Sequence, residues 1–168
     1  GIFKVLSDDT TIEMEGVISS KTPKNFDLLI SRFPNAKKVN MIICPGSEDD
    51  DSNLEVSKKM HKRKMEFHLS SFSLIASGAV DMYVSGAKRT RETGSKIGVH
   101  SWSDGKGVEA TDFPVGHENH LQYINYYVSV GFTKKEAEDF YYFTINSAKA
   151  NDVHYMTDEE IEKYKILK

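Results

Sequence analysis

Strand-like and helix-like segments alternate along this chain, and that alternation constrains the fold more than any other feature. Residues 11–19 are rich in β-formers and loosely alternate, and residues 38–44 form a short apolar run that stops at Pro45-Gly46. Residues 96–102 are also strongly strand-like. Strands separated by helices build strand–helix–strand units, in which the strands run parallel in one sheet. The sequence therefore predicts an α/β fold with a mainly parallel sheet flanked by helices.

Three of the expected helices carry clear start signals. A Thr-Pro pair at residues 22–23 opens one helix, with Thr22 as the N-cap. Thr133 caps a second helix, and Thr157 with Glu160 three positions later forms a capping box for the last one.

The middle of the chain has weaker signals. A helix is expected over residues 53–65 and a short strand over residues 66–69. Residues 74–84 are expected to form an apolar helix that opens near Ser77.

Composition excludes several classes of protein. The 168 residues contain no repeat, low-complexity tract or Pro/Gly-rich linker, so we expect one domain over residues 1–168. The single cysteine, Cys44, excludes an intramolecular disulfide and a zinc site built on several thiolates. A net charge of -3 argues against a nucleic-acid partner, which usually needs a basic face. No run approaches the roughly 18–20 apolar residues that span a bilayer, so no membrane span is expected.

The first residues do not resemble a natural N-terminus. They lack both an initiator methionine and a signal-peptide core, so we expect the numbering to begin inside a longer natural chain or at an artificial junction.

Two glycine-containing turns occur where a strand is expected to give way to a helix. Gly46 lies in the first turn, and the carboxyl ends of parallel strands are where backbone N–H groups meet a ligand. The second turn holds Ser77 between small neighbours, where a helix start would leave free N–H groups. Acyl transfer needs such a nucleophile and such donors for the oxyanion of the tetrahedral intermediate. Taken alone, a tight turn at Gly46 and a helix N-cap at Ser77 are the commoner explanations.

His100 gives the serine a candidate partner. It lies on the expected strand 96–102, close to Trp102, the only tryptophan. A histidine there accepts the proton of Ser77 if the two strand ends are neighbours. Without knowledge of the fold the pair is a weak signal, because many chains contain such a serine and histidine by accident.

Four short segments occur in an informative order. Residues 45–47 (PGS) look like a Pro-Gly-Gly oxyanion turn, and residues 76–79 (ASGA) look like an Ala-Ser nucleophile turn. Residues 97–100 (IGVH) are similar to a strand that carries a basic histidine, and residues 155–160 (YMTDEE) to a Phe-Met-Ser-Ala-Glu-Glu segment. Together they resemble the proteolytic-subunit family of Clp protease, especially its divergent, often exported bacterial relatives. The resemblance implies a ClpP/crotonase-like fold of repeated ββα units and the activity of a serine peptidase.

Carried across by position, the resemblance makes Ser77 the nucleophile and His100 the general base. The backbone N–H groups of Gly78 and of Gly46 or Ser47 would then form the oxyanion hole. The chain departs from the family in having Gly-Ser where the family has Gly-Gly. Four acidic residues at positions 48–51 follow that turn, and a solvated loop is their favoured explanation.

The third member of a triad is less well defined. The family's aspartate stands just before the Phe-Met-Ser segment, and an ungapped match places Val153 there. Asp152, one position earlier, would orient His100 and stabilise its protonated form after a one-residue adjustment. Otherwise Asp152 is a loop or helix-entry residue, and the protein is a weak or inactive hydrolase.

No metal or other cofactor is expected. His117 and His120 share a helix face, but they lack the H-E-x-x-H spacing and have no evident third ligand. Surface or helix-start positions explain them better, although they fall where they would line a substrate groove. The many aromatic residues in segments 123–127 and 140–143 serve mainly as core, and any excess would form an oligomer interface. The resemblance implies a homo-oligomer, because members of the family form rings or trimers.

Three functions compete on these observations. A serine hydrolase acting on a peptide or other acyl substrate is favoured by Ser77 and His100. A catalytically silent ClpP-like binding or assembly module is favoured by the missing acid and the Gly-Ser turn. A crotonase-like acyl-thioester enzyme would need a coenzyme A pocket, for which no segment is suited. The likeness to exported relatives favours a periplasmic or secreted location over a cytoplasmic one.

Overall fold

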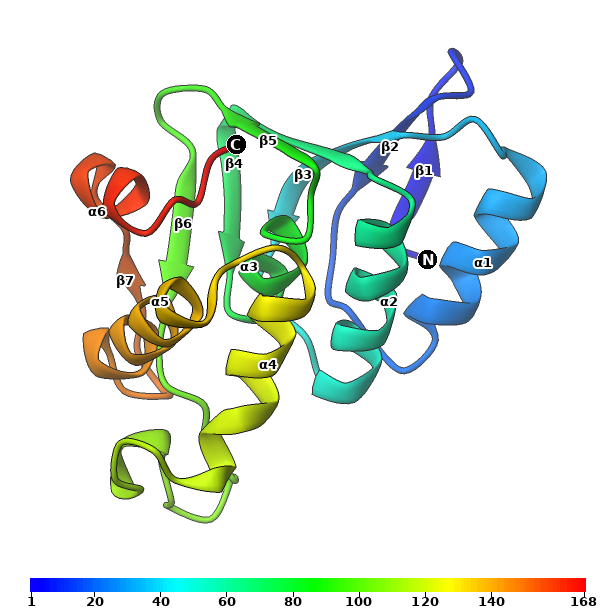
Figure 1. Ribbon diagram of the computed structural model, residues 1–168. Helices are drawn as coiled ribbons and strands as arrows, with labels where there is room; N and C mark the ends of the chain where they lie inside the picture. The colour runs from blue at the N-terminus through cyan, green and yellow to red at the C-terminus, as the bar shows by residue number, and fades with distance from the viewer.

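The computed structural model describes residues 1–168 (Figure 1). Its strands are β1 Phe3–Val5, β2 Thr11–Met14, β3 Lys38–Cys44, β4 Glu66–Ala76, β5 Lys88–Arg91, β6 Lys96–Val99 and β7 His154–Tyr155. Its helices are α1 Thr22–Arg32, α2 Asp50–Lys62, α3 Gly78–Tyr83, α4 Leu121–Ser129, α5 Lys134–Ser147 and α6 Asp158–Lys163, with short 3₁₀ turns at Ala110–Asp112 and Glu118–His120.

All the strands belong to one sheet. Its order is β1-β2-β3-β4-β6-β7, and β5 lies beside the first half of β4. The long strand β4 pairs with β5 along 66–69 and with β6 along 74–76, so it serves two short strands in succession. The inner pairs are parallel, and only β1 and β7 at the two ends are antiparallel to their neighbours. The predicted mainly parallel sheet is confirmed, and the carboxyl ends of β3, β4 and β6 lie side by side.

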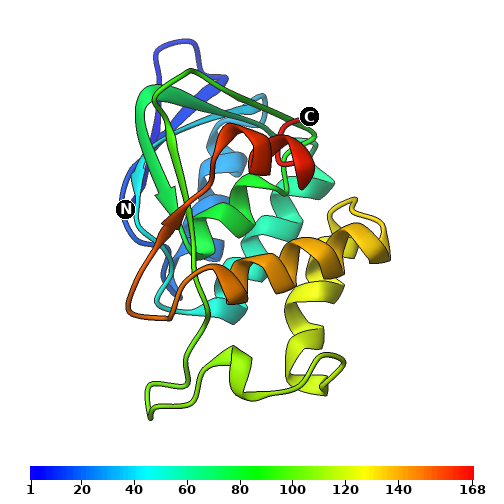
Figure 2. The ribbon, with the colours of Figure 1, turned by 90° about the vertical axis from the view of Figure 1, so that its left-hand side faces the viewer.

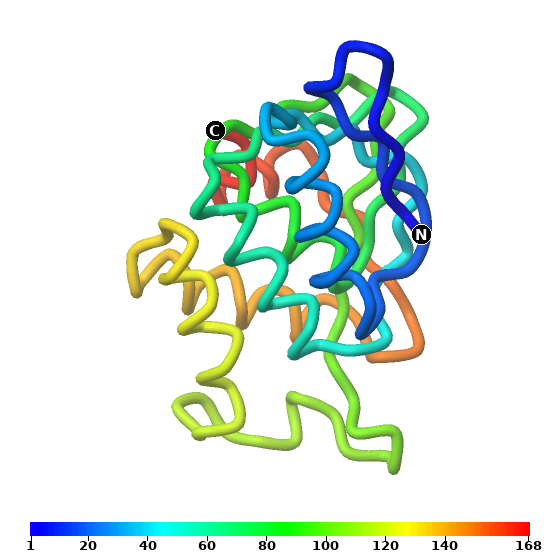
Figure 3. Tube along the Cα trace, turned by 90° about the vertical axis from the view of Figure 1, so that its right-hand side faces the viewer, coloured from blue at the N-terminus to red at the C-terminus, as the bar shows by residue number.

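The long helices pack on one face of the sheet, as the two side views show (Figures 2 and 3). Alternate residues of β4, including Phe67, Leu69 and Ile75, point into the layer between sheet and helices and are buried. Thirty-five buried apolar residues form one continuous core there. On β3 the intervening residues Lys38 and Asn40 are polar and more exposed, as a sheet face without helices requires. None of the helices combines the length and apolarity needed to cross a membrane.

The segment before Ser77 is a strand where the sequence favours a helix, so this expectation was wrong. β4 continues through residues 74–76, which are hydrogen-bonded in parallel register to residues 96–98 of β6 and to the end of β3. A helix starts only at Gly78. Sheet pairing on both sides of the segment overrides its local helical pattern. The correction places Ser77 at a strand-to-helix junction.

The acidic stretch after Gly46 begins a helix and is not a free loop. Asp49 is the N-cap of α2, and its carboxylate accepts a hydrogen bond of 3.0 Å from the Ser52 N–H. Asp50 and Asp51 occupy the first turn, where negative charge is favoured by the helix dipole. The helix therefore starts three residues earlier than expected.

Candidate active site

Three loops that follow neighbouring parallel strands meet at one edge of the sheet. Gly46 follows β3, Ser77 follows β4 and His100 follows β6. Because β3 and β6 both pair with the end of β4, the three residues come together although they are far apart in sequence. This is the edge at which open α/β sheets bind ligands.

Ser77 has an unusual backbone. Its φ is 56° and its ψ is −127°, a combination that residues with a side chain rarely adopt. Its N–H donates a 3.0 Å hydrogen bond to Gly98 O, which ties the turn to β6. Although Ser77 occupies the N-cap position of α3, its side chain makes no capping hydrogen bond. The hydroxyl group is therefore not used to cap the helix, as is also true of the serine in a nucleophile elbow.

The turn after β3 lies directly against Ser77. A Cβ atom built on Gly46 would be 3.3 Å from Ser77 Cβ and 3.6 Å from Ser77 Oγ, and Gly46 has a φ of 149°. Gly46 and Ser47 lie in the turn between β3 and α2, and their backbone N–H groups donate to no backbone carbonyl. Gly78 is the first residue of α3, where an N–H has no partner within the helix. These donors surround Ser77 as the sequence predicts for an oxyanion hole, and that role stays a prediction.

His100 is oriented by its own chain. Its Nδ1 lies 2.7 Å from Ser101 O. A carbonyl oxygen only accepts hydrogen bonds, so this contact assigns the proton to Nδ1 and leaves Nε2 as an acceptor. Ser77 and His100 line the same cavity of about 70 Å³. No hydrogen bond joins the two side chains in this structure.

Asp152 is not brought to His100. It lies on an exposed turn between α5 and β7, and its carboxylate accepts a 2.8 Å hydrogen bond from the Val153 N–H. Val153 faces β6 instead, because a Cβ atom built on Gly98 would lie only 2.6 Å from Val153 Cγ2. A valine thus lies where the family resemblance expects the aspartate, and the contact to His100 Nδ1 comes from a backbone carbonyl.

The remaining walls of the cavity come from residues that the sequence did not single out as functional. They are supplied by α2, α3, α4, α5 and the segment after His100, and include Asp50, Asp81, Trp102, Tyr123, Tyr127 and Tyr141. Burial and, to a smaller extent, the nearby Asp50 carboxylate raise the pKa of Asp81 to about 7, although a hydrogen bond from Tyr127 opposes the shift. No local sequence signal could have found this carboxyl group beforehand, apart from its place one turn after Ser77.

The histidines of the 117–120 segment have structural roles in the aromatic layer. His120 is fully buried, with Nδ1 2.7 Å from the Tyr141 hydroxyl and Nε2 3.2 Å from Phe113 O. Both ring nitrogens are therefore engaged. The Tyr141 hydroxyl also accepts a 2.8 Å hydrogen bond from Trp102 Nε1, which links His120 to the wall of the cavity. The structure has no group of three or more His, Cys, Asp or Glu side chains placed to hold a metal ion.

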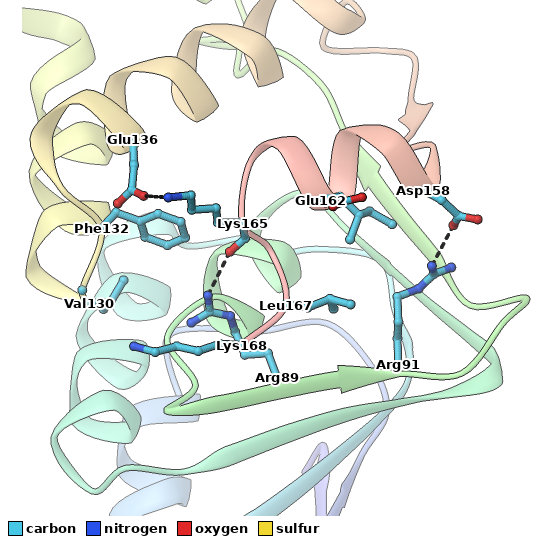
Figure 4. Close-up of a pocket in the computed structure, with 12 residues that line it drawn as sticks. Arg89, Arg91, Val130, Phe132, Glu136, Asp158, Glu162, Lys165, Leu167 and Lys168 are labelled. Atoms are coloured by element: carbon cyan, nitrogen blue, oxygen red, sulfur yellow. Dashed lines mark hydrogen bonds and ion pairs between the residues drawn. The ribbon is translucent and has the colours of Figure 1, made fainter.

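A larger cavity of about 650 Å³ lies at the opposite end of the sheet, between β5, α6 and the start of α5 (Figure 4). Two of its cations are in ion pairs: Arg91 lies 2.9 Å from Asp158, and Lys165 lies 2.8 Å from Glu136. Arg89 donates to four backbone carbonyls, including those of the C-terminal segment. No serine, cysteine or histidine lines this cavity.

No family model and no curated protein sequence matches this chain. Solved structures do match. A variant of the 1510-N membrane-bound stomatin-specific protease has a TM-score of 0.60 and 20% identity, over 95% of this chain and 76% of that one. A variant of ClpP1 from Listeria monocytogenes also has a TM-score of 0.60, with 14% identity over 95% of this chain and 90% of that one. A second variant of the stomatin-specific protease, in complex with a substrate peptide, has a TM-score of 0.58 and 20% identity, over 95% of this chain and 72% of that one.

Proposed function

The chain has the ClpP-like fold of the ClpP/crotonase-like superfamily, as the sequence predicts, and on that basis we propose that it is a serine hydrolase, most simply a peptidase. The observation that carries the proposal is the geometry of Ser77. Its hydroxyl group is free of capping bonds at a strained strand-to-helix turn, and it lines one cavity with His100. The proteases among the structural neighbours support the same chemistry.

In the proposed reaction Ser77 Oγ attacks the acyl carbon of the substrate while His100 Nε2 takes the hydroxyl proton. The carbonyl oxygen becomes negative and is held by the N–H groups of Gly78 and of Gly46 or Ser47. Collapse of this intermediate breaks the acyl–nitrogen bond, and the leaving amine takes the proton from His100. Water then repeats the sequence on the acyl-enzyme, releases the carboxylate product and restores the serine.

The Ser101 carbonyl supports the base in place of a carboxylate. Its contact with Nδ1 fixes the tautomer in which Nε2 is free to accept a proton. A neutral carbonyl stabilises the imidazolium less than a carboxylate does, so we expect a slower enzyme than one with a complete triad. Asp152 as the third member stays a prediction from the sequence.

A catalytically silent module is the second candidate, and a specific observation favours it. Val153 packs against Gly98 at the place of the expected acid, and Ser77 makes no hydrogen bond to His100. Catalytic hydrogen bonds are often long before substrate binds, so the missing contact alone does not decide between the two functions. Nothing in the cavity favours the acyl-thioester alternative.

We also propose that the chain acts as one domain and assembles as a homo-oligomer. The continuous core supports a single domain. Several large apolar side chains are exposed, among them Phe72 at 65% and Val115 at 79%, and a second copy would cover such groups.

Hydrolysis of an activated ester tests the function. We expect an initial burst of product from acylation of Ser77, and loss of the burst in Ser77→Ala and His100→Ala. Ser71→Ala, an exposed serine outside the cavity, is the matched control and should retain it. Asp152→Asn should lower the rate less than about threefold, whereas a triad aspartate would cost about 10⁴-fold. A folded wild-type protein with no burst would favour the silent module.

A further inference from the structure

A half-buried carboxyl group lies in the cavity beside Ser77. Asp81 is four residues after Ser77, on the same short helix, and it lines the cavity. Its Oδ1 accepts a 2.5 Å hydrogen bond from the Tyr127 hydroxyl. The other carboxylate oxygen has no hydrogen-bond partner, and no lysine or arginine pairs with Asp81. Every fully buried side-chain polar atom in the protein has a partner, so this free oxygen is not sealed in the core.

The surroundings of Asp81 contain no fixed positive charge. No lysine or arginine lines the cavity, and His100 is the only side chain there that can become cationic. The second acidic side chain, Asp50, accepts hydrogen bonds from Tyr123 at 2.7 Å and from Ser47 at 3.2 Å. A carboxylate held in such a place without a counter-ion is unfavourable, and a cation entering from a substrate would remove that cost.

The size and the lining of the cavity favour one kind of cationic side chain. Its other walls are apolar or aromatic, from Val80, Val99, Trp102 and Phe140, and suit a chain of methylene groups. At about 70 Å³ it is narrow. Tyr127 already donates to one oxygen of Asp81, so the two oxygens are not equally open to the bidentate fork of an arginine. A single free oxygen suits the point charge of an ammonium group.

We propose that this cavity is the specificity pocket of the hydrolase and that Asp81 binds the side-chain ammonium of a lysine on the acyl side of the scissile bond. The inference rests on the proposed function, because it names the substrate class of the same site. Asp81 is a binding residue for the substrate and takes no part in bond making.

The ionisation of Asp81 agrees with this role. The pKa of about 7 in the free protein reflects burial and the nearby Asp50, and a bound ammonium would hold the carboxyl group ionised. The other groups that face Asp81 are Tyr126, whose hydroxyl donates to the Asp81 carbonyl, and Tyr127, with Tyr123 and His100 across the cavity. The preference for lysine should therefore strengthen as the pH rises through about 7.

Peptidyl diphenyl phosphonates test the inference, because they modify only an activated serine and carry a chosen side chain into the pocket. Three matched probes would present lysine, arginine or norleucine. At about pH 8 we expect the lysine probe to modify Ser77 at least about tenfold faster than the norleucine probe, the size expected for a hydrogen bond between charged groups. The arginine probe should be slower than the lysine probe.

Asp81→Asn should abolish the preference for lysine, so that the lysine and norleucine probes modify Ser77 at similar rates. The asparagine oxygen still accepts the Tyr127 hydrogen bond, so the fold should be kept. Asp51→Asn is the control, because Asp51 lies in the first turn of α2, outside the cavity, and pairs with Gln122. Faster reaction with norleucine, or an unchanged lysine preference in Asp81→Asn, would overturn the inference.

Two readouts separate this inference from the proposed function. If the norleucine probe or a small fluorophosphonate labels the protein but the lysine probe is no faster than the norleucine probe, only the assignment of the specificity pocket is rejected. No labelling by any probe would reject the hydrolase itself and the inference with it. In the Ser77→Ala protein, a short peptide ending in lysine should bind at least about tenfold more tightly than its norleucine counterpart.

Discussion

Ser77 combines a side chain free of capping bonds with local strain. Its backbone dihedrals lie in a region that glycine tolerates and other residues avoid, at a cost of about 1–3 kcal/mol. The hydrogen bond from the Ser77 N–H to Gly98 O and the close approach of Gly46 hold the Ser77 backbone in this conformation. Strain kept at one serine, with a free hydroxyl group, is what a functional role predicts and what a merely capping residue does not need.

Replacing Ser77 in two ways measures that strain. Both Ser77→Gly and Ser77→Ala remove the hydroxyl group, but only glycine relaxes the backbone. We expect Ser77→Gly to have a free energy of unfolding about 1 kcal/mol or more above that of Ser77→Ala. Urea unfolding of the two variants would check this. Equal stabilities would mean that the turn stores no strain at this residue.

The raised pKa of Asp81 makes the free energy of unfolding depend on pH, and this dependence can be measured separately from that of other groups. Its pKa is about 7 in the folded protein and about 3.9 in an unfolded chain, so between these values the folded protein holds a proton that the unfolded chain lacks. The stabilising contribution of this proton is fully present below about pH 4 and is lost as the pH rises through about 7.

The Asp81→Asn variant reveals this contribution, because asparagine does not titrate. Raising the pH from about 4 to about 8 should lower the free energy of unfolding of the wild type, relative to the variant, by as much as about 4 kcal/mol. Denaturant titrations of both proteins at the two pH values measure the difference. If the free energies of unfolding of the wild type and the variant differ by the same amount at both pH values, the raised pKa of Asp81 is contradicted.

At the scale of the elements, local signals predicted those helices and strands whose stability is local. Thr133 caps α5 and Thr157 forms the capping box of α6, both as expected, and β3 has its predicted bounds. The local pattern failed at residues 74–76, because their strand conformation depends on pairing with β3 and β6. It also failed at the start of α2, where the acidic residues serve as cap and first turn. The strand at residues 74–76 could not be predicted locally, because its pairing partners are distant in sequence.

The junction of β6 with β7 positions His100, and its packing can be tested. A methyl group at residue 98 would lie 2.6 Å from Val153 Cγ2 and 3.2 Å from Tyr155 Cε1. We expect Gly98→Ala to lower the free energy of unfolding by about 1–3 kcal/mol and to slow any reaction that uses His100. Adding Val153→Ala to Gly98→Ala should recover part of the lost free energy of unfolding and part of the lost rate. Val153→Ala alone should lower the free energy of unfolding by less than this recovery. Strictly additive effects would show that the two residues do not meet.

At the scale of the whole molecule, the fold and the shared location of Ser77 and His100 could be predicted, since the alternation of strands and helices and the order of short motifs along the chain indicate them. The rest of the cavity could not. Asp50, Asp81 and Tyr123 come from three helices, and their convergence is a property of the tertiary structure. The exposed position of Asp152 and the inward position of Val153 depend on how one turn meets β6. The aspartate is thus one position away from the residue that packs against β6, and the contact to His100 Nδ1 comes from the Ser101 carbonyl.

Labelling with a small fluorophosphonate, followed by mass spectrometry of the modified peptide, tests the central claim most directly. We expect one adduct, on Ser77, which is absent in Ser77→Ala and strongly reduced in His100→Ala. Ser71→Ala should label like the wild type. A folded wild-type protein that takes up no probe, or an adduct that survives unchanged in His100→Ala, would contradict an activated Ser77–His100 pair.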